Sequence, residues 1–130
     1  MVLLACTLAI GNIAFRATSR RYLNMGAKTE ELIRVLDELI AVLESDDEEH
    51  WSAWFRNARA QLLDSDYAGI ASVLSAFGGM GSFNDLTLGR SYKNGVLCWK
   101  AGYGDLNKRL EGLKDDVSRL AGEVKKLQFA

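Results

Sequence analysis

Hydrophobic residues recur every three or four positions along most of the chain, which is the period of an α-helix with one buried face. Between Glu30 and Glu44 the apolar positions are Leu32, Ile33, Leu36, Leu39, Ile40 and Leu43. After Ser45 they are Trp51, Trp54, Phe55, Ala58 and Leu62, and after residues 64–66 they are Tyr67, Ile70, Val73, Leu74 and Phe77. The pattern predicts three helices joined by short loops, so that successive helices are antiparallel neighbours. We expect one core that holds Trp51, Trp54, Phe55, Ile70, Leu74 and Phe77 against Leu36, Ile40 and Leu43.

Polar residues at the ends of these runs indicate where each helix begins and ends. Thr29 is the expected N-cap of the first helix, and Ser45 and Glu48 have capping-box spacing for the second. Residues 64–66 form a second cap cluster before the third helix. Gly78 is expected to end that helix, as a glycine in the left-handed conformation commonly does.

The last helix has the most regular pattern, over Asp105–Phe129. Its apolar residues alternate spacings of four and three, at Leu106, Leu110, Leu113, Val117, Leu120, Val124 and Leu127. This narrow seam suits one facing helix, which could be residues 1–15, residues 30–44 or the same helix of a second copy. We therefore expect this helix to mediate protein contact, within the fold for its first half and between chains for its second half, through Val117, Leu120, Val124 and Leu127.

A glycine-rich stretch, residues 78–104, separates the third helix from the last. Its two strand-like runs are residues 86–88 and 96–99, and Asn94-Gly95 is a strong turn signal before the second run. The sequence therefore predicts a mainly α fold: a small helical bundle with a glycine-rich insert, read as a short β-hairpin or an irregular excursion, before a long C-terminal helix.

The first fifteen residues are uncharged and are followed by Arg16, Arg20 and Arg21. The run is shorter than the roughly 20 apolar residues of a spanning helix, and its basic residues follow it, unlike those of a secretory signal. We favour a buried or partner-covered helix, with an inner-membrane anchor through residues 2–15 and an extension ahead of a start at Met25 as alternatives. The expected division is an apolar segment over 1–24 and one helical domain over 25–130.

Composition excludes several classes of protein. The 130 residues carry a formal net charge of -1, are 48% hydrophobic and contain no proline. A near-neutral chain cannot displace the counterions of nucleic acid as a strongly basic one does, so no nucleic-acid partner is expected. Two cysteines 92 positions apart make no disulfide framework.

Candidate chemistry is sparse. His50, the single histidine, follows the acidic residues 46–49, which read more simply as a helix N-terminus than as a calcium loop. Cys6 and Cys98 have no partner motif for zinc or for nucleophilic catalysis. We therefore expect no catalytic residue, no metal site and no cofactor.

The segment from Phe77 to Leu86 is the most distinctive in the chain. We expect Gly78 or Gly79 to adopt a positive φ, Ser82 or Asp85 to bond a nearby backbone amide, and Met80, Phe83 and Leu86 to fold back onto the core. The alternative is a binding or partner-contacting role for Gly79, Met80, Ser82, Asn84 and Asp85.

The run FGGMGSFNDLTL, residues 77–88, resembles the signature of a small family of bacterial proteins of unknown function. The resemblance covers about the last hundred residues and includes a tryptophan-containing helix and a leucine-rich terminal helix that opens near an asparagine, here Asn107. It implies a bacterial, mostly helical, cytoplasmic protein without a known catalytic centre. Many immunity proteins of toxin systems are small proteins of this kind, which is an analogy of class.

Three functions follow, in order of preference. The first is a non-enzymatic interaction protein with a protein partner or a second copy, of which toxin neutralisation is the sharpest version. The second is a membrane-tethered accessory protein. The third is an enzyme or small-ligand binder centred on the glycine-rich turn.

Overall fold

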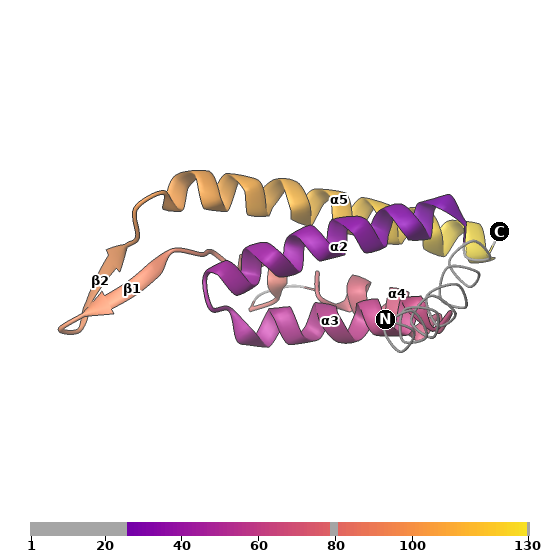
Figure 1. Cartoon of the computed structure of the whole chain (residues 1–130), viewed down its shortest axis with the longest axis horizontal. Coiled ribbons are helices and arrows are strands. Elements are labelled where there is room, and N and C mark those ends of the chain that lie inside the picture. The colour runs from indigo at the N-terminus through magenta and orange to yellow at the C-terminus, as the bar shows by residue number, and fades with distance from the viewer. Residues whose placement is uncertain (1–25, 79–80, 130) are drawn as a thin grey trace, which may run out of the picture.

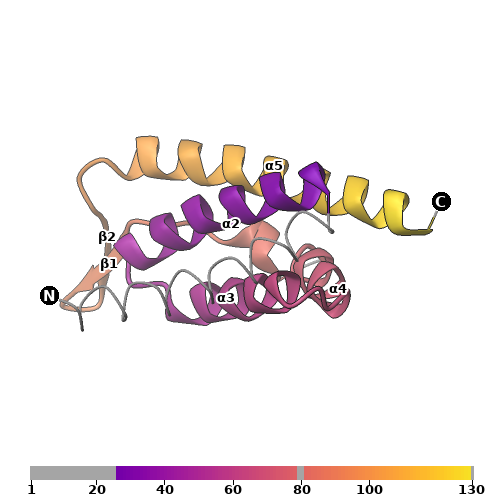
Figure 2. The same cartoon turned by 45° about the vertical axis from the view of Figure 1, so that its right-hand side comes forward.

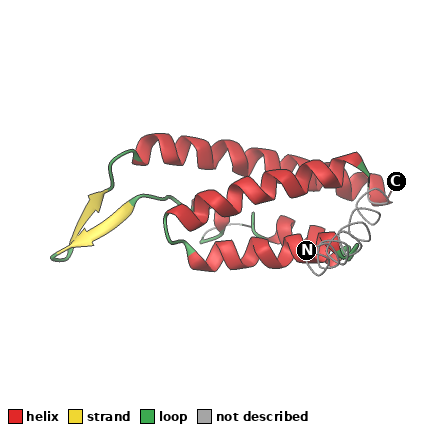
Figure 3. Cartoon of the chain, in the orientation of Figure 1, coloured by secondary structure: helices red, strands yellow, loops and turns green. Residues whose placement is uncertain are grey.

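The computed structural model describes residues 26–78 and 81–129, which form an elongated helical bundle with a projecting hairpin (Figure 1). Helix α2 spans Ala27–Ser45, α3 spans Glu49–Leu63, α4 spans Ala68–Ser75 and α5 spans Tyr103–Phe129. A 3-10 turn, η1, covers Phe83–Asp85, and strands β1 (Arg90–Lys93) and β2 (Val96–Trp99) form an antiparallel pair. The predicted fold class is confirmed, and Figure 3 shows the hairpin as the one sheet within these residues.

Helix α2 lies between α5 and α3 and packs against both (Figures 1 and 2). Its predicted apolar face is buried throughout, at Leu32, Ile33, Leu36, Leu39, Ile40 and Leu43. The two long helices are also joined at the far end from the hairpin, where Lys28 Nζ lies 2.9 Å from Glu123 Oε2. The hydrogen bond from Lys28 lowers the pKa of the Glu123 carboxyl below its ordinary value.

The seam of α5 belongs to the core of the chain itself. Val117 and Leu120 are fully buried and Val124 is 4% exposed, because α2 and α4 pack against this face. A partner could reach these three residues only if the bundle opened. Leu127, the fourth expected contact, is 66% exposed at the end of the helix.

The predicted core residues are buried at its centre, but several residues predicted at its edge are only partly buried. Phe55 and Ile70 are buried as expected, whereas four predicted core residues are only partly buried: Trp51, Trp54, Leu74 and Phe77. Trp54 lies at the rim of this core, where its indole Nε1 donates to the Ser72 carbonyl oxygen, 2.9 Å away, and so ties α3 to α4.

Two predicted caps are wrong in position. Thr29 lies inside the first turn of α2 and is buried, because the helix begins two residues earlier, after Gly26. Ser45 ends α2 instead of opening α3, and its hydroxyl donates to the Val42 carbonyl oxygen. Glu48 is itself the N-cap of α3, and its carboxylate accepts from the Trp51 amide at 2.9 Å.

The end of α4 also differs from the prediction. The helix ends at Ser75, and Gly78 has no positive φ, so it is not the expected left-handed stop. Among the described glycines of this segment, Gly81 is left-handed, with φ 75°. The Phe83 amide donates to the Ala76 carbonyl oxygen, so the start of η1 is bonded to the residue that follows α4. This contact forms without a positive φ at Gly78.

The apolar segment over 1–24 lies outside the described residues, as do Gly79 and Met80. The three readings of that segment therefore stay predictions. Within residues 26–78 and 81–129, no helix has both the length and the apolar character needed to cross a bilayer.

Candidate functional site

The glycine-rich turn uses its polar side chains to hold its own backbone. Asp85 Oδ2 accepts from the Gly81 amide at 2.8 Å, and Ser82 Oγ accepts from the Asn84 amide at 3.3 Å. The Asn84 side-chain amide donates to the Phe77 carbonyl oxygen at 3.4 Å. The predicted capping by Ser82 and Asp85 is thus confirmed, and these bonds fix the turn that presents Phe83 to the core.

Phe83 anchors the turn and a lysine holds it in place. The Phe83 ring is fully buried, with its centroid 4.7 Å from that of Phe55 and 5.3 Å from that of Trp51. Lys114 of α5, only 2% exposed, donates from Nζ to the carbonyl oxygens of Asn84 (3.1 Å) and Leu86 (2.8 Å). The same ammonium pairs with Glu111 at 3.1 Å and lies 5.3 Å from the Phe83 ring centroid, within the range of a cation–π contact.

Two further side chains fix the backbone just before the hairpin. Asn107 brackets Leu88, since its Oδ1 accepts from the Leu88 amide (2.7 Å) and its Nδ2 donates to the Leu88 carbonyl oxygen (2.8 Å). Asp46 accepts from the Gly89 amide at 2.9 Å and pairs with Lys100 at 3.0 Å. The base of the hairpin is therefore bonded both to α5 and to the α2–α3 turn.

Gly89 allows the closest approach at this base. It has φ 86°, and a β-carbon there would lie 2.6 Å from Cβ of Tyr103. Gly102 has a similar φ of 80° but open space around it.

Asparagine tolerates a positive φ better than most residues, so the same substitution at both glycines isolates the steric clash. We expect Gly89→Asn to lower the free energy of unfolding by about 2–3 kcal/mol, and Gly102→Asn by less than about 1 kcal/mol. Urea titration followed by circular dichroism measures both. Equal losses at the two positions would show that the approach of Tyr103 to Gly89 does not constrain the fold.

The hollow beside the glycine-rich turn is small, and two of its polar side chains already bond to the backbone of the turn. It has a volume of about 190 Å³ and is lined by Trp51, Gly81, Ser82, Asp85, Leu86 and Arg90. Ser82 and Asp85 use oxygen atoms to accept from backbone amides, as described above. The predicted binding residues Ser82, Asn84 and Asp85 thus have bonding roles within the turn.

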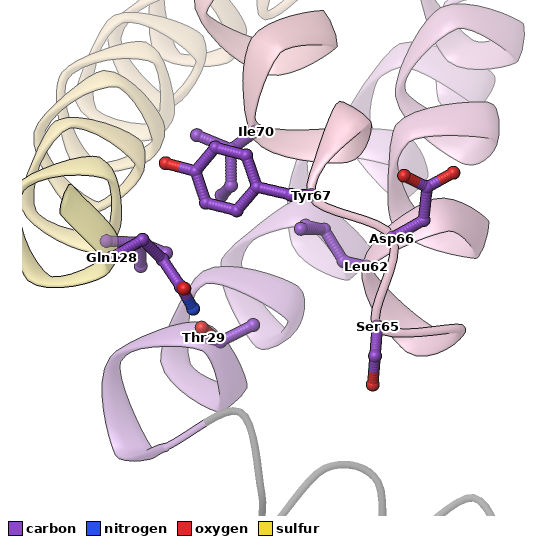
Figure 4. Close-up of a pocket in the computed structure, with 8 residues that line it drawn as sticks. Thr29, Leu62, Ser65, Asp66, Tyr67, Ile70 and Gln128 are labelled. Atoms are coloured by element: carbon purple, nitrogen blue, oxygen red, sulfur yellow. The ribbon is translucent and has the colours of Figure 1, made fainter.

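Two other hollows lie elsewhere on the bundle. One, about 400 Å³, is formed by the acidic α2–α3 turn and the start of α3 and is lined by Glu44, Asp47, Glu48, Glu49, Ser52, Ala53 and Arg56. The second, about 200 Å³, lies between the start of α2, the α3–α4 turn and the end of α5, where Thr29, Tyr67 and Gln128 surround it (Figure 4). Asp66, the charged residue among its described lining, accepts from the Ala68 amide, so we assign this pocket no ligand.

His50 and Cys98 are the described residues that were weighed for catalysis. His50 is exposed and its ring packs on the edge of Trp51, with centroids 4.8 Å apart. Cys98 lies on β2 as a free cysteine. Among the residues that the structure describes, no group of three or more His, Cys, Asp or Glu side chains is placed to hold a metal ion.

The hairpin is built as its turn signal predicts, but its first strand lies further along the chain. Asn94 and Gly95 have φ values of 54° and 79°, the pair of positive values that a tight two-residue turn of type I′ requires. The first strand is β1 and not residues 86–88, because the backbone of Leu88 is bonded to Asn107 instead of to a strand. The cross-strand pairs are Arg90–Trp99, Ser91–Cys98, Tyr92–Leu97 and Lys93–Val96.

This register divides the hairpin into two faces, because cross-strand partners and alternate residues share a side. One face carries Arg90, Tyr92, Leu97 and Trp99, and the other carries Ser91, Lys93, Val96 and Cys98. Trp99 stacks on Tyr103 of α5, with ring centroids 4.8 Å apart. We call the set Tyr92, Leu97, Trp99 and Tyr103 the aromatic face.

The aromatic face is exposed although it is apolar. Tyr92 is 69% exposed, and Leu97, Trp99 and Tyr103 are each exposed by 43–45%. Figure 1 shows the hairpin extending away from the end of the bundle, where no described helix covers it. A contiguous group of large apolar side chains in this position is typical of a contact surface.

Charge distinguishes the hairpin from the neighbouring α2–α3 turn. Residues 86–104 contain Arg90, Lys93 and Lys100 and no acidic residue, whereas the neighbouring residues 44–49 contain five acidic residues. This surface was not predicted from the sequence, although the cationic and aromatic composition of the insert is a signal for it.

Comparison with known proteins finds a family model that is similar to part of this chain. Residues 44–98, from the end of α2 into β2, match the model of a domain of unknown function, DUF6966. No curated protein and no solved structure matches the chain. The matched segment contains the glycine-rich turn and the hairpin up to Cys98, and α5 lies outside it.

Proposed function

We propose that the chain is a non-enzymatic protein-interaction module that binds its partner through the aromatic face of the hairpin. The observation that carries the proposal is the exposure of Tyr92, Leu97, Trp99 and Tyr103 on an arm that projects from an otherwise well-packed bundle. Aromatic residues and arginine are enriched at protein interfaces and supply much of the binding energy there. Arg90, on the same face of the hairpin, completes that composition.

The base of the hairpin is fixed to the bundle by hydrogen bonds. Asn107, Asp46 and Lys114 bond the chain just before and beside the hairpin, so the strands leave the bundle from a fixed base. A two-stranded hairpin alone is only marginally stable in water. A base held by the bundle reduces the ordering cost of binding, and a partner that covers the aromatic face would stabilise the arm further.

We place the partner contact on the hairpin and not on α5 as the sequence suggested, because Val117, Leu120 and Val124 are buried in the core. The cations of the arm favour a partner with an acidic contact surface, since opposite charges speed encounter and suppress wrong partners. Neutralisation of a toxin is the sharper version of the proposal, and it rests on the analogy with small bacterial immunity proteins.

The test is affinity capture from the source organism with variants matched on the two faces of the hairpin. We expect Tyr92→Ser together with Leu97→Ser to reduce the captured partner by at least about tenfold, because hot-spot residues are each worth about 2 kcal/mol or more. Val96→Ser removes a side chain of the opposite face that is 62% exposed and should leave capture unchanged.

Circular dichroism of both variants checks that the bundle stays folded. Equal capture by the double variant and the wild type would refute the proposed contact surface.

A further inference from the structure

Among the residues that the structure describes, nothing pairs with the outer edge of β2, and this strand is uncharged. Within residues 26–78 and 81–129 the sheet has two strands, so neither hairpin strand has a neighbour on its outer side. The amide of Lys100 donates to the Gly89 carbonyl oxygen, and in an antiparallel ladder bonded and non-bonded pairs then alternate from that point. Leu97 and Trp99 fall in non-bonded pairs, so their backbone N–H and C=O groups point outward from β2.

The two edges of the hairpin differ in charge. β1 reads Arg-Ser-Tyr-Lys and carries a cation at each end, which is a common way to block pairing at an edge. β2 reads Val-Leu-Cys-Trp and carries no charge. Two copies of β1 would bring their cations together, whereas two copies of β2 meet without charge repulsion.

One antiparallel register uses all the outward-pointing groups of β2. With a two-fold axis at Cys98, Leu97 of each copy pairs with Trp99 of the other, and those are the residues whose backbone groups point outward. Cys98 then faces its own copy in a non-bonded pair, where Cα atoms lie about 4.5 Å apart. Leu97 and Trp99 belong to one face of the hairpin, so this register also extends the aromatic face across both copies.

We propose that the chain forms a symmetric dimer through β2, which makes one four-stranded antiparallel sheet from two hairpins. Three or more strands give a hairpin the stability that two strands lack. The cationic β1 strands become the outer edges of this sheet, so assembly stops at two copies. The proposal goes beyond the proposed function and does not depend on it, because the pairing uses the strand edge and leaves the aromatic face accessible.

The first test uses Cys98 as a probe of the two-fold axis. In a chain with Cys6→Ser, mild oxidation with copper phenanthroline should give a disulfide-linked dimer on non-reducing gels, because the expected Cα separation suits a disulfide. The control is Cys6→Ser with Cys98→Ser and Ser91→Cys, which moves the thiol to the paired position on β1. Those two positions would lie about 14 Å apart in the dimer, so the control should give no dimer.

The second test measures the equilibrium without oxidation. Sedimentation equilibrium from about 1 µM to about 1 mM should show a monomer–dimer transition of modest affinity, as expected of a small interface. Cys98→Lys places two cations opposite each other and should raise Kd by about fivefold or more, whereas Ser91→Lys should not change it.

A wild-type chain that stays monomeric over this range, or a dimer that is unaffected by Cys98→Lys, would overturn the proposal. Equal cross-linking through the thiol on β1 would overturn it as well. Partner capture that fails while the dimer persists would refute the proposed function alone.

Discussion

Replacing Phe83 with alanine is expected to lower the free energy of unfolding by about 3–5 kcal/mol. The ring is fully buried, and its centroid lies within 5.6 Å of those of Phe55, Trp51 and Phe77. Alanine would leave a cavity at the point where the glycine-rich turn meets α3. Urea titration followed by tryptophan fluorescence and circular dichroism measures the loss.

Tyr92→Ala is the matched control, because it also removes an aromatic ring but from a position that is 69% exposed. Its expected loss is within about 0.5 kcal/mol. A loss below about 1 kcal/mol for Phe83→Ala would mean that the turn does not anchor the core.

Replacing Lys114 with methionine is expected to release the glycine-rich turn. Methionine keeps the length and apolar stem of the lysine but removes the donor for the Asn84 and Leu86 carbonyl oxygens. Charged hydrogen bonds are worth more than neutral ones, but the lost ammonium no longer has to be desolvated, so we expect a net loss of about 1–3 kcal/mol. Hydrogen exchange should show weaker protection at the amides that the turn bonds, those of Gly81, Asn84 and Leu86.

Arg109→Met serves as the control, because Arg109 is an exposed residue of the same helix. It should change neither stability nor exchange in the turn. Unchanged protection of the turn in Lys114→Met would show that the ammonium is not what holds it.

The helices could be predicted because their apolar residues repeat with the helical period and because those faces meet in one core. Leu32–Leu43 and the seam of α5 satisfy both conditions, and their seam positions from Leu110 to Val124 are buried. Helix ends were less predictable, since local capping signals compete with each other. Ser45 and Glu48 could together cap α3, but the structure uses Glu48 alone and leaves Ser45 in α2.

The candidate site was less predictable because the burial or exposure of its residues depends on how the helices and the hairpin are arranged in space. Lys114 reads as one more charged residue beside the seam, and only the fold shows that it is buried under the turn. Likewise, Tyr92, Leu97 and Trp99 would be core residues in many hairpins. Here they stay exposed because the hairpin extends beyond the bundle, a fact about tertiary arrangement that periodicity does not contain.

Site-specific photo-cross-linking in living cells tests most directly whether the aromatic face of the hairpin contacts another protein. A benzophenone amino acid in place of Tyr92 should give a discrete adduct with a different protein, identified by mass spectrometry. The same probe in place of Val96, which is similarly exposed on the opposite face, should give much less of that adduct. An adduct of equal yield from both positions, or none from Tyr92, would contradict that contact.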